Sequence, residues 1–221
     1  MDTQGYGQFI HEQIKTWPIG KPVTTAAIST SLADAFKIGI DNAKKITNVN
    51  MKRLADKGEL TRVQRGVYGV VKDTSFGKVI PRLVNMLPAI LLHDGVNFIG
   101  YLAGPTLLNR LGLSTLIPAD SHIATNRYRY RLPENTSIRI YKPLLTVNDE
   151  NVLYLQALEA IIAMERYHVD VEKPDGVMRA VLQKNNIDNE KLVLYARRYC
   201  GQKTLLKTID IALGGSRDQT T

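Results

Sequence analysis

Cysteine is nearly absent from this chain of 221 residues, which contains only Cys200. A single thiol excludes an internal disulfide framework and any zinc site built from several cysteines. Long apolar runs are also missing. The longest stretch without a charged residue or histidine runs for 15 residues from Gly95 to Asn109, and it includes glycine, proline and asparagine. Because a bilayer span needs about 20 apolar residues, we expect no transmembrane helix and no membrane partner.

The amino terminus lacks the features of a secretion signal. The opening residues, Met1-Asp2-Thr3-Gln4-Gly5, provide neither a basic segment nor an apolar core. Hydrophobic residues make up 44% of the chain and charged residues 23%, which is an ordinary balance for a globular protein with its own core. These features together favour a cytoplasmic protein.

Acidic residues are the scarcer charge, with 21 Asp and Glu against 29 Lys and Arg and a formal net charge of +8. Such an excess favours an anionic partner. The excess is concentrated, since residues 37–72 contain nine basic and three acidic residues. Residues 151–221, with ten basic and nine acidic residues, are almost neutral. The first third of the chain is therefore where an anionic partner is expected to bind.

The pattern of this first third predicts three helices followed by a β-hairpin. The helices are expected at about residues 7–17, from a cap at Thr24 or Thr25 to a turn near residue 38, and at about 43–57. Strands at 60–64 and 67–71 flank an Arg65-Gly66 turn, where glycine tolerates a positive φ. This is the order of a winged helix-turn-helix, in which the third helix enters the major groove of DNA.

The third helix contains most of the candidate DNA contacts. Its buried face is expected to include Ile46, Val49 or Asn50, and Leu54, with Thr47 and Met51 mostly on the other sides. Asn, Lys and Arg are residue types that bind purine edges and phosphates. The candidates are Lys44, Lys45, Asn48, Lys52 and Arg53 on the helix, and Arg62 and Arg65 beside the wing. Two alternatives stay open: a basic face that is only solvated, and a winged helix that binds protein.

Residues 76–147 predict a small α/β unit with a second basic feature. Arg127, Arg129 and Arg131 alternate with tyrosines, which predicts a strand with all three arginines on one face. Residues 137–142 predict the antiparallel return strand of a hairpin. The arginine face either contacts DNA backbone or an acidic partner, or is the solvated side of the unit. From about residue 148 to 214, the pattern predicts helices that pack on one another.

Catalytic motifs are missing as well. The sequence contains no phosphate-binding loop, no G-x-G-x-x-G and no G-x-S-x-G. The four histidines are scattered, with no i,i+4 pair. We therefore expect no enzymatic activity, no cofactor and no metal site.

One stretch resembles a known family. The residues from Met51 to Val71, which include the sequence Arg65-Gly66-Val67-Tyr68, resemble the end of the N-terminal winged helix of AbiEi-type antitoxins. Phe76–Pro81 and Gly104–Thr115 resemble further segments of these proteins, so that the likeness covers roughly residues 45–145. The resemblance implies that the winged helix binds inverted repeats in its own promoter and represses it. It also implies that the C-terminal part counters a nucleotidyltransferase toxin encoded next door.

These observations predict an α+β protein with two domains. Residues 1–75 are expected to form a winged helix-turn-helix DNA-binding domain, and residues 76–221 an AbiEi-like C-terminal domain whose helical part begins near 148. The expected function is a transcriptional autorepressor that resembles the antitoxin of an AbiE-type toxin–antitoxin system, with double-stranded DNA and a nucleotidyltransferase-type toxin as partners. The alternative is a protein-interaction module that neutralises or scaffolds a partner without specific DNA binding. A homodimer is compatible with both.

Overall fold

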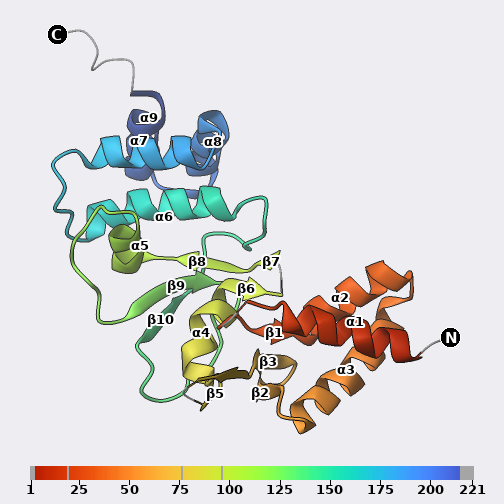
Figure 1. Cartoon of the computed structure of the whole chain (residues 1–221). Coiled ribbons are helices and arrows are strands. Elements are labelled where there is room, and N and C mark those ends of the chain that lie inside the picture. Colours follow the sequence, from red (N-terminus) through yellow and green to blue (C-terminus); the bar gives the residue numbers. More distant parts are fainter. Residues whose placement is uncertain (1–2, 19, 76, 96, 215–221) are drawn as a thin grey trace. The chain divides into compact units, whose positions relative to one another are not determined.

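The chain folds as a mixed α+β protein in a computed structural model that describes residues 3–18, 20–75, 77–95 and 97–214 (Figure 1). Its contacts divide it into two compact units, Met1–Asn97 and Phe98–Thr221. Residues 77–95, which the sequence pattern assigned to the C-terminal domain, belong to the first unit. The reason is that Met86 and Ile90 are buried against Val67 of the expected wing. Phe76, which opens one of the family-like segments, lies outside the described residues.

The first unit begins with three helices and a small sheet, as the sequence pattern predicts. A helix and a short strand come first, followed by two more helices and a hairpin. The elements are α1 (Thr3–Lys15), β1 (Val23–Thr24), α2 (Thr25–Phe36), α3 (Ile40–Asp56), β2 (Leu60–Gln64) and β3 (Val67–Val70). The sheet is antiparallel with the order β1-β3-β2. β1 therefore joins the start of α2 to the hairpin.

Local signals in the sequence set the ends of α2. The expected cap is confirmed, because the Ala27 N–H donates to the Thr24 hydroxyl oxygen at 3.1 Å. Such a bond satisfies one of the unpaired donors at a helix start. At the other end, Lys37 adopts a left-handed conformation with φ of 53°. The short connection that follows leads directly into α3.

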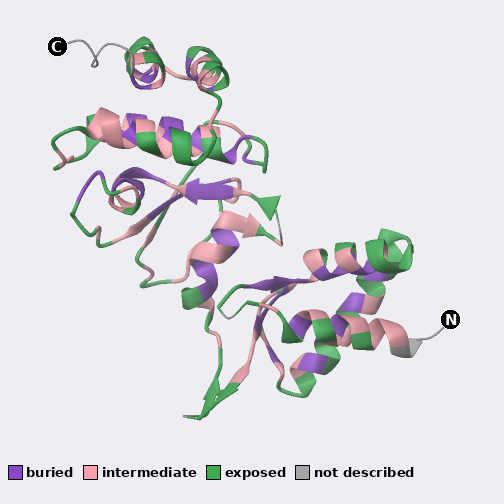
Figure 2. Cartoon of the chain, turned by 45° about the horizontal axis from the view of Figure 1, so that its top comes forward, coloured by how far each residue is buried: buried purple, intermediate pink, exposed green. Residues whose placement is uncertain are grey.

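The buried face of α3 differs from the expected one. Ala43, Thr47, Met51 and Leu54 are buried, and Val49 is 50% exposed. Leu54 was placed correctly, and Ile46 packs half-buried against the same core. Of the alternatives Val49 and Asn50, the first is exposed and the second half-buried, and the expectation that Thr47 and Met51 lie mostly on the other sides was wrong. Hydrophobicity favours Ile46 and Val49, whereas the packing against α1 and α2 selects one stripe whose spacing of four, four and three follows the helical repeat. Figure 2 shows this inner side of the first unit as buried.

The first unit ends with a second layer of short elements. These are β4 (Lys72–Thr74), β5 (Gly77–Val79), α4 (Leu83–Leu92) and β6 (His93–Asp94), and β7 (Asn97–Phe98) spans the division. β4 and β5 pair in antiparallel register. Close packing on the β2–β3 hairpin requires Gly69, since a Cβ there would lie 2.6 Å from the Cβ of Pro81. The connection after this hairpin is thereby fixed against β3.

The second unit is a three-stranded sheet covered by helices. Its elements are β8 (Gly100–Leu102), α5 (Gly104–Arg110), β9 (Ser121–Thr125), β10 (Ile138–Tyr141), α6 (Val152–Arg166), α7 (Pro174–Lys184), α8 (Asn189–Tyr199) and α9 (Gln202–Leu213). The mostly buried helix α6 packs on β8 and α5 with one side and on α8 and α9 with another (Figure 1). The expected helical part is therefore confirmed. Among the described residues, no helix has the length and apolar character needed to cross a bilayer.

The predicted arginine strand and antiparallel hairpin are wrong. β9 ends at Thr125, a turn follows, and β10 pairs with β9 in parallel register. The side chain of Asn126 ends the strand, because it donates to Val147 O at 2.9 Å and accepts from Val147 N–H at 2.8 Å. Residues 126–137 then make the crossover of about a dozen residues that parallel pairing requires. Arg127, Arg129 and Arg131 thus lie in a connection and share no strand face.

A half-buried carboxylate ties α6 to α5. The Gly104 N–H donates to Glu159 Oε1 at 3.1 Å. Burial raises the pKa of Glu159 above its ordinary value of 4.5, against the opposing effects of the Gly104 hydrogen bond and the charge of Arg166. The charged form of Glu159 is therefore disfavoured by the fold.

We expect Thr47→Val to stabilise the first unit by about 1 kcal/mol. Thr47 is fully buried, and its hydroxyl has no hydrogen-bond partner among the described residues. Valine has the same shape without the desolvation cost. Urea unfolding followed by the fluorescence of Trp17, the chain's single tryptophan, reports on this unit. A lower midpoint for the variant would contradict the burial of this face.

We expect Glu159→Gln to remove a pH-dependent loss of stability. A carboxyl whose pKa is higher in the folded state than in the unfolded state stabilises the fold below the unfolded pKa, and this contribution is lost as the pH rises through the folded pKa. The wild type should therefore lose stability relative to the variant as the pH rises from 4.5. Gln keeps an oxygen for the Gly104 N–H. Calorimetry at several pH values measures the free energy of unfolding of both proteins. A difference between wild type and variant that stays constant across this range would contradict the raised pKa of Glu159.

Candidate nucleic-acid interface

The exposed face of α3 is defined by the face that is buried. Lys45, Asn48, Val49 and Lys52 are exposed. Lys45, Val49 and Lys52 lie across the helix from the buried stripe, and Asn48 lies at its border, three residues before Met51. Burial of that stripe therefore orients these four side chains toward solvent. Along the helix, the amide of Asn48 lies between the ammonium groups of Lys45 and Lys52, with Val49 beside them. Such a surface is suited to base edges and phosphates.

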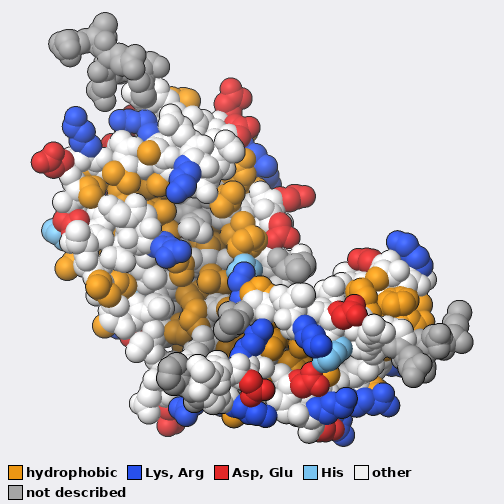
Figure 3. Space-filling view, in the orientation of Figure 1, with side chains coloured by type: hydrophobic (Ala, Val, Ile, Leu, Met, Phe, Trp, Pro, Cys, Tyr) orange, Lys and Arg blue, Asp and Glu red, His pale blue; other side chains and the backbone are white. Residues whose placement is uncertain are grey.

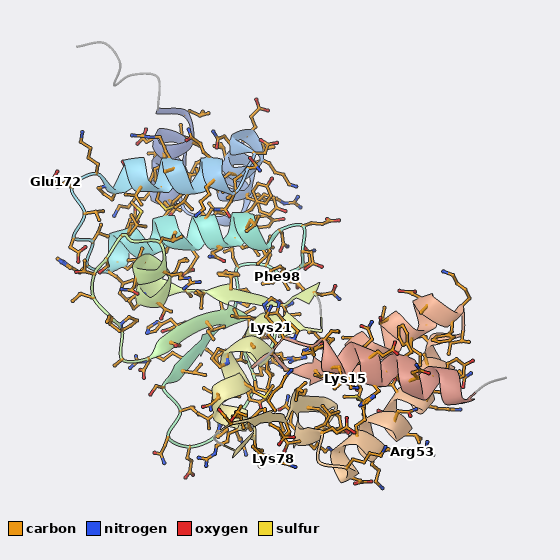
Figure 4. The ribbon with its side chains drawn as sticks, in the orientation of Figure 1. Lys15, Lys21, Arg53, Lys78, Phe98 and Glu172 are labelled. Atoms are coloured by element: carbon orange, nitrogen blue, oxygen red, sulfur yellow. The ribbon has the colours of Figure 1, made fainter. Side chains whose placement is uncertain are left out.

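The remaining cations of α3 flank this face. Lys44 and Arg53 are exposed, and Lys44 Nζ lies 3.3 Å from the Asp41 carboxylate. Both partners are highly exposed, so this pair adds little stability and leaves Lys44 available to another anion. Asp56 is exposed at the other end of the helix. Figure 4 labels Arg53, and Figure 3 shows Lys and Arg side chains gathered over this part of the first unit with a few acidic ones among them.

The β2–β3 hairpin contains the two expected wing arginines, Arg62 within β2 and Arg65 in the turn. Arg62 and Arg65 are both exposed, whereas Tyr68 is buried in the core. Gly66 has φ of 74°, and its carbonyl accepts from the Thr25 N–H at 2.9 Å. The turn is thus anchored to the first residue of α2. Its arginines are presented from a hairpin that is fixed to the helical core.

The structure also gathers four lysines that the sequence pattern did not single out. They line a cavity of about 290 Å³ in the first unit, and they are Lys15, Lys57, Lys72 and Lys78. Glu59 and Asp73 are the acidic residues of the same lining, and Glu59 lies 2.7 Å from His11 Nε2. Figure 4 labels Lys15 and Lys78. These lysines come from α1, the end of α3, β4 and β5, so no local pattern connects them and only the overall charge excess hinted at them.

The arginines of the second basic feature belong to the second unit. Arg129 and Arg131 are exposed and Arg127 is half-buried. The Tyr130 N–H donates to Arg127 O at 2.8 Å, which closes a turn in this segment. The guanidinium of Arg129 and the ammonium of Lys142 lie 5.5 Å and 5.7 Å from the centroid of the Tyr128 ring. The segment is therefore a basic turn held against an aromatic ring.

Comparison with known proteins gives a family and no function. No curated protein matches the chain. Residues 24–190 match a family described as a family of unknown function, DUF6088. This range includes α2, α3, the hairpin and most of the second unit. Because the match covers more than half of the sequence, the chain belongs to the DUF6088 family of unknown function.

Proposed function

We propose that this protein is a DNA-binding transcriptional regulator whose first unit is a winged helix-turn-helix. The observation that supports it most is the exposed row of Lys45, Asn48 and Lys52 on α3, outside the buried stripe. The order of three helices and an antiparallel hairpin, with β1 on the hairpin's outer edge, also fits such a domain. In this proposal α3 enters the major groove and Asn48 contacts a base edge.

The neighbouring cations fit contacts to the DNA backbone. Lys44 and Arg53 flank the α3 face, and Arg62 and Arg65 project from the wing. Backbone contacts fix the register of the protein on DNA and add affinity that depends on salt. The lysine cavity beside β4 and β5 offers further ammonium groups of the same kind. Together they form a cationic surface around one candidate for base recognition.

The proposal extends to autorepression and to an antitoxin role, which follow from the resemblance to AbiEi-type antitoxins. In that extension the DNA consists of inverted repeats in the protein's own promoter, and the second unit binds a nucleotidyltransferase-type toxin. One observation favours a protein partner for the second unit. The helices α6, α8 and α9 each keep a large apolar side chain exposed, namely Leu153, Leu194 and Leu206. Apolar side chains of this kind form the centre of protein interfaces.

We expect the full chain to bind the duplex upstream of its own gene in the presence of competitor DNA. Asn48→Ala should reduce the preference for this duplex over competitor by about 1–3 kcal/mol, since a base contact is lost. Lys52→Ala should weaken binding to all sequences alike and lower the slope of log K against log salt by about one. Fluorescence anisotropy at several salt concentrations measures both effects.

Lys184→Ala is the matched control, because Lys184 is an exposed lysine at the end of a helix in the second unit. It should bind as the wild type does. The regulator proposal fails if the wild type shows no preference for any genomic fragment, or if the control weakens binding as much as Lys52→Ala.

The antitoxin extension has its own test. We expect the full chain to co-purify with a nucleotidyltransferase encoded by the neighbouring gene, and Lys45→Glu with Lys52→Glu should leave this complex intact. Leu194→Ser, which changes an exposed position on α8, should weaken it. If the complex is lost with the α3 variants and kept with Leu194→Ser, the two roles are not divided between the units as proposed.

A further inference from the structure

The second unit contains a cavity whose walls combine aromatic rings with charged groups. Its volume is about 270 Å³, just below the range of ~300–1,000 Å³ that is typical of pockets for drug-sized ligands. A space of this size excludes a duplex and admits one small molecule or one unstacked nucleotide. Six of its lining residues have chemistry suited to a ligand: His122, Tyr141, Lys142, Glu159, Arg166 and Tyr167.

The rings are held in place by the fold. His122 is buried, and its backbone N–H donates to the Thr106 hydroxyl oxygen at 2.8 Å. Its ring nitrogen Nδ1 lies 2.9 Å from the hydroxyl of Tyr141. The His122 and Tyr141 rings stack at 5.4 Å, and the ring of Tyr167 meets His122 edge-on at 6.4 Å. Tyr141 and Tyr167 nevertheless keep 38% and 40% of their surface exposed. Two aromatic rings are therefore available at the cavity without rearrangement of the core.

Gly104 allows these rings to come together. Its φ is +50°, and a Cβ at this position would lie 3.1 Å from His122 Nδ1 and 3.3 Å from Cε2 of Tyr167. The same residue donates its N–H to Glu159 Oε1. These bonds use one carboxylate oxygen of Glu159 and one ring nitrogen, Nδ1, of His122. The second carboxylate oxygen of Glu159 and the second ring nitrogen of His122 can therefore bond to a ligand in the cavity.

The charges around the cavity favour an anion. Lys142 and Arg166 are cationic, and the only carboxylate of the lining, Glu159, has its charged form disfavoured by burial. Lys142 also contacts the ring of Tyr128, which is shared with Arg129. The basic turn of residues 127–131 therefore lies beside the cavity and adds positive potential there. A planar guanidinium and an ammonium that line the same cavity are suitable groups for binding phosphate.

We propose that this cavity binds a single nucleotide, with its base against the rings of Tyr141 and Tyr167 and its phosphate at Lys142 and Arg166. Aromatic rings stack on any base, so the site accepts nucleotides without strong choice of base. The nucleotide is either free or an unpaired terminal nucleotide of a nucleic-acid strand. The proposal does not depend on DNA binding by the first unit, because every residue involved belongs to the second.

The test is a titration of the full, isotope-labelled chain with the four nucleoside monophosphates, followed by NMR. We expect shift changes at residues 101–104, 122–124, 141–144 and 159–167. Arg166→Met should weaken binding about tenfold or more. Arg197→Met removes the same charge from an exposed position on α8 outside the cavity, and should bind as the wild type does. Tyr167→Leu should weaken nucleotide binding about tenfold by removing one stacking ring.

The control ligands separate the parts of the proposal. Adenosine and inorganic phosphate should each bind more weakly than AMP. A duplex with a one-nucleotide 3′ overhang, compared with its blunt form, distinguishes the two sources: shifts in the cavity with the overhang alone identify a strand end, and shifts with free AMP alone identify a free nucleotide. The proposal is overturned if neither source shifts these residues at about 10 mM, well above a Kd of 1 mM. It is equally overturned if Arg166→Met binds as tightly as Arg197→Met, or if phosphate binds as tightly as AMP.

Discussion

Burial of one stripe of α3 is the constraint on which the first unit depends. Ala43, Thr47 and Met51 are fully buried, and they fix the rotation of the helix about its own axis. Once this rotation is set, Lys45 and Lys52 can only point to solvent. The cationic face therefore follows from the apolar one, and a helix that buried Val49 would have presented a different set of side chains.

The β2–β3 hairpin depends on the same core. Val67 and Tyr68 are buried, and the Gly66 carbonyl accepts a hydrogen bond from the first residue of α2. The turn that contains Arg65 is thus connected to the helices by a backbone hydrogen bond as well as by packing. Gly69 then allows Pro81 to pack against β3, and Met86 and Ile90 of α4 pack against Val67 of the same strand. A cationic helix and a cationic turn are in this way held by one continuous set of contacts.

The order of elements could be predicted from local patterns because its signals are local. Thr24 caps α2, Gly66 turns the hairpin, and the C-terminal helices lie close to the expected positions. The predictions that were wrong concern segments whose local pattern fits more than one structure. Contacts with distant residues decide between these structures. Alternation predicted a strand through Arg127–Arg131, but the bonds between Asn126 and Val147, 21 residues apart, end β9 before it. The cavity lined by four lysines and the cavity lined by Tyr141 and Tyr167 were not predicted for a related reason, since each is assembled from segments distant in sequence.

The two units contain different kinds of cationic surface. The first presents cations on a convex helix and a turn, a shape that fits a groove, and the second gathers them around a small cavity with rings. The proposed regulator function requires that the α3 face contact DNA. Chemical acetylation of lysines, read by mass spectrometry with and without the upstream duplex, tests it most directly. Shielding of Lys45 and Lys52 with unchanged modification of Lys184 is the predicted result, and equal modification of Lys45 and Lys52 in both samples would contradict it.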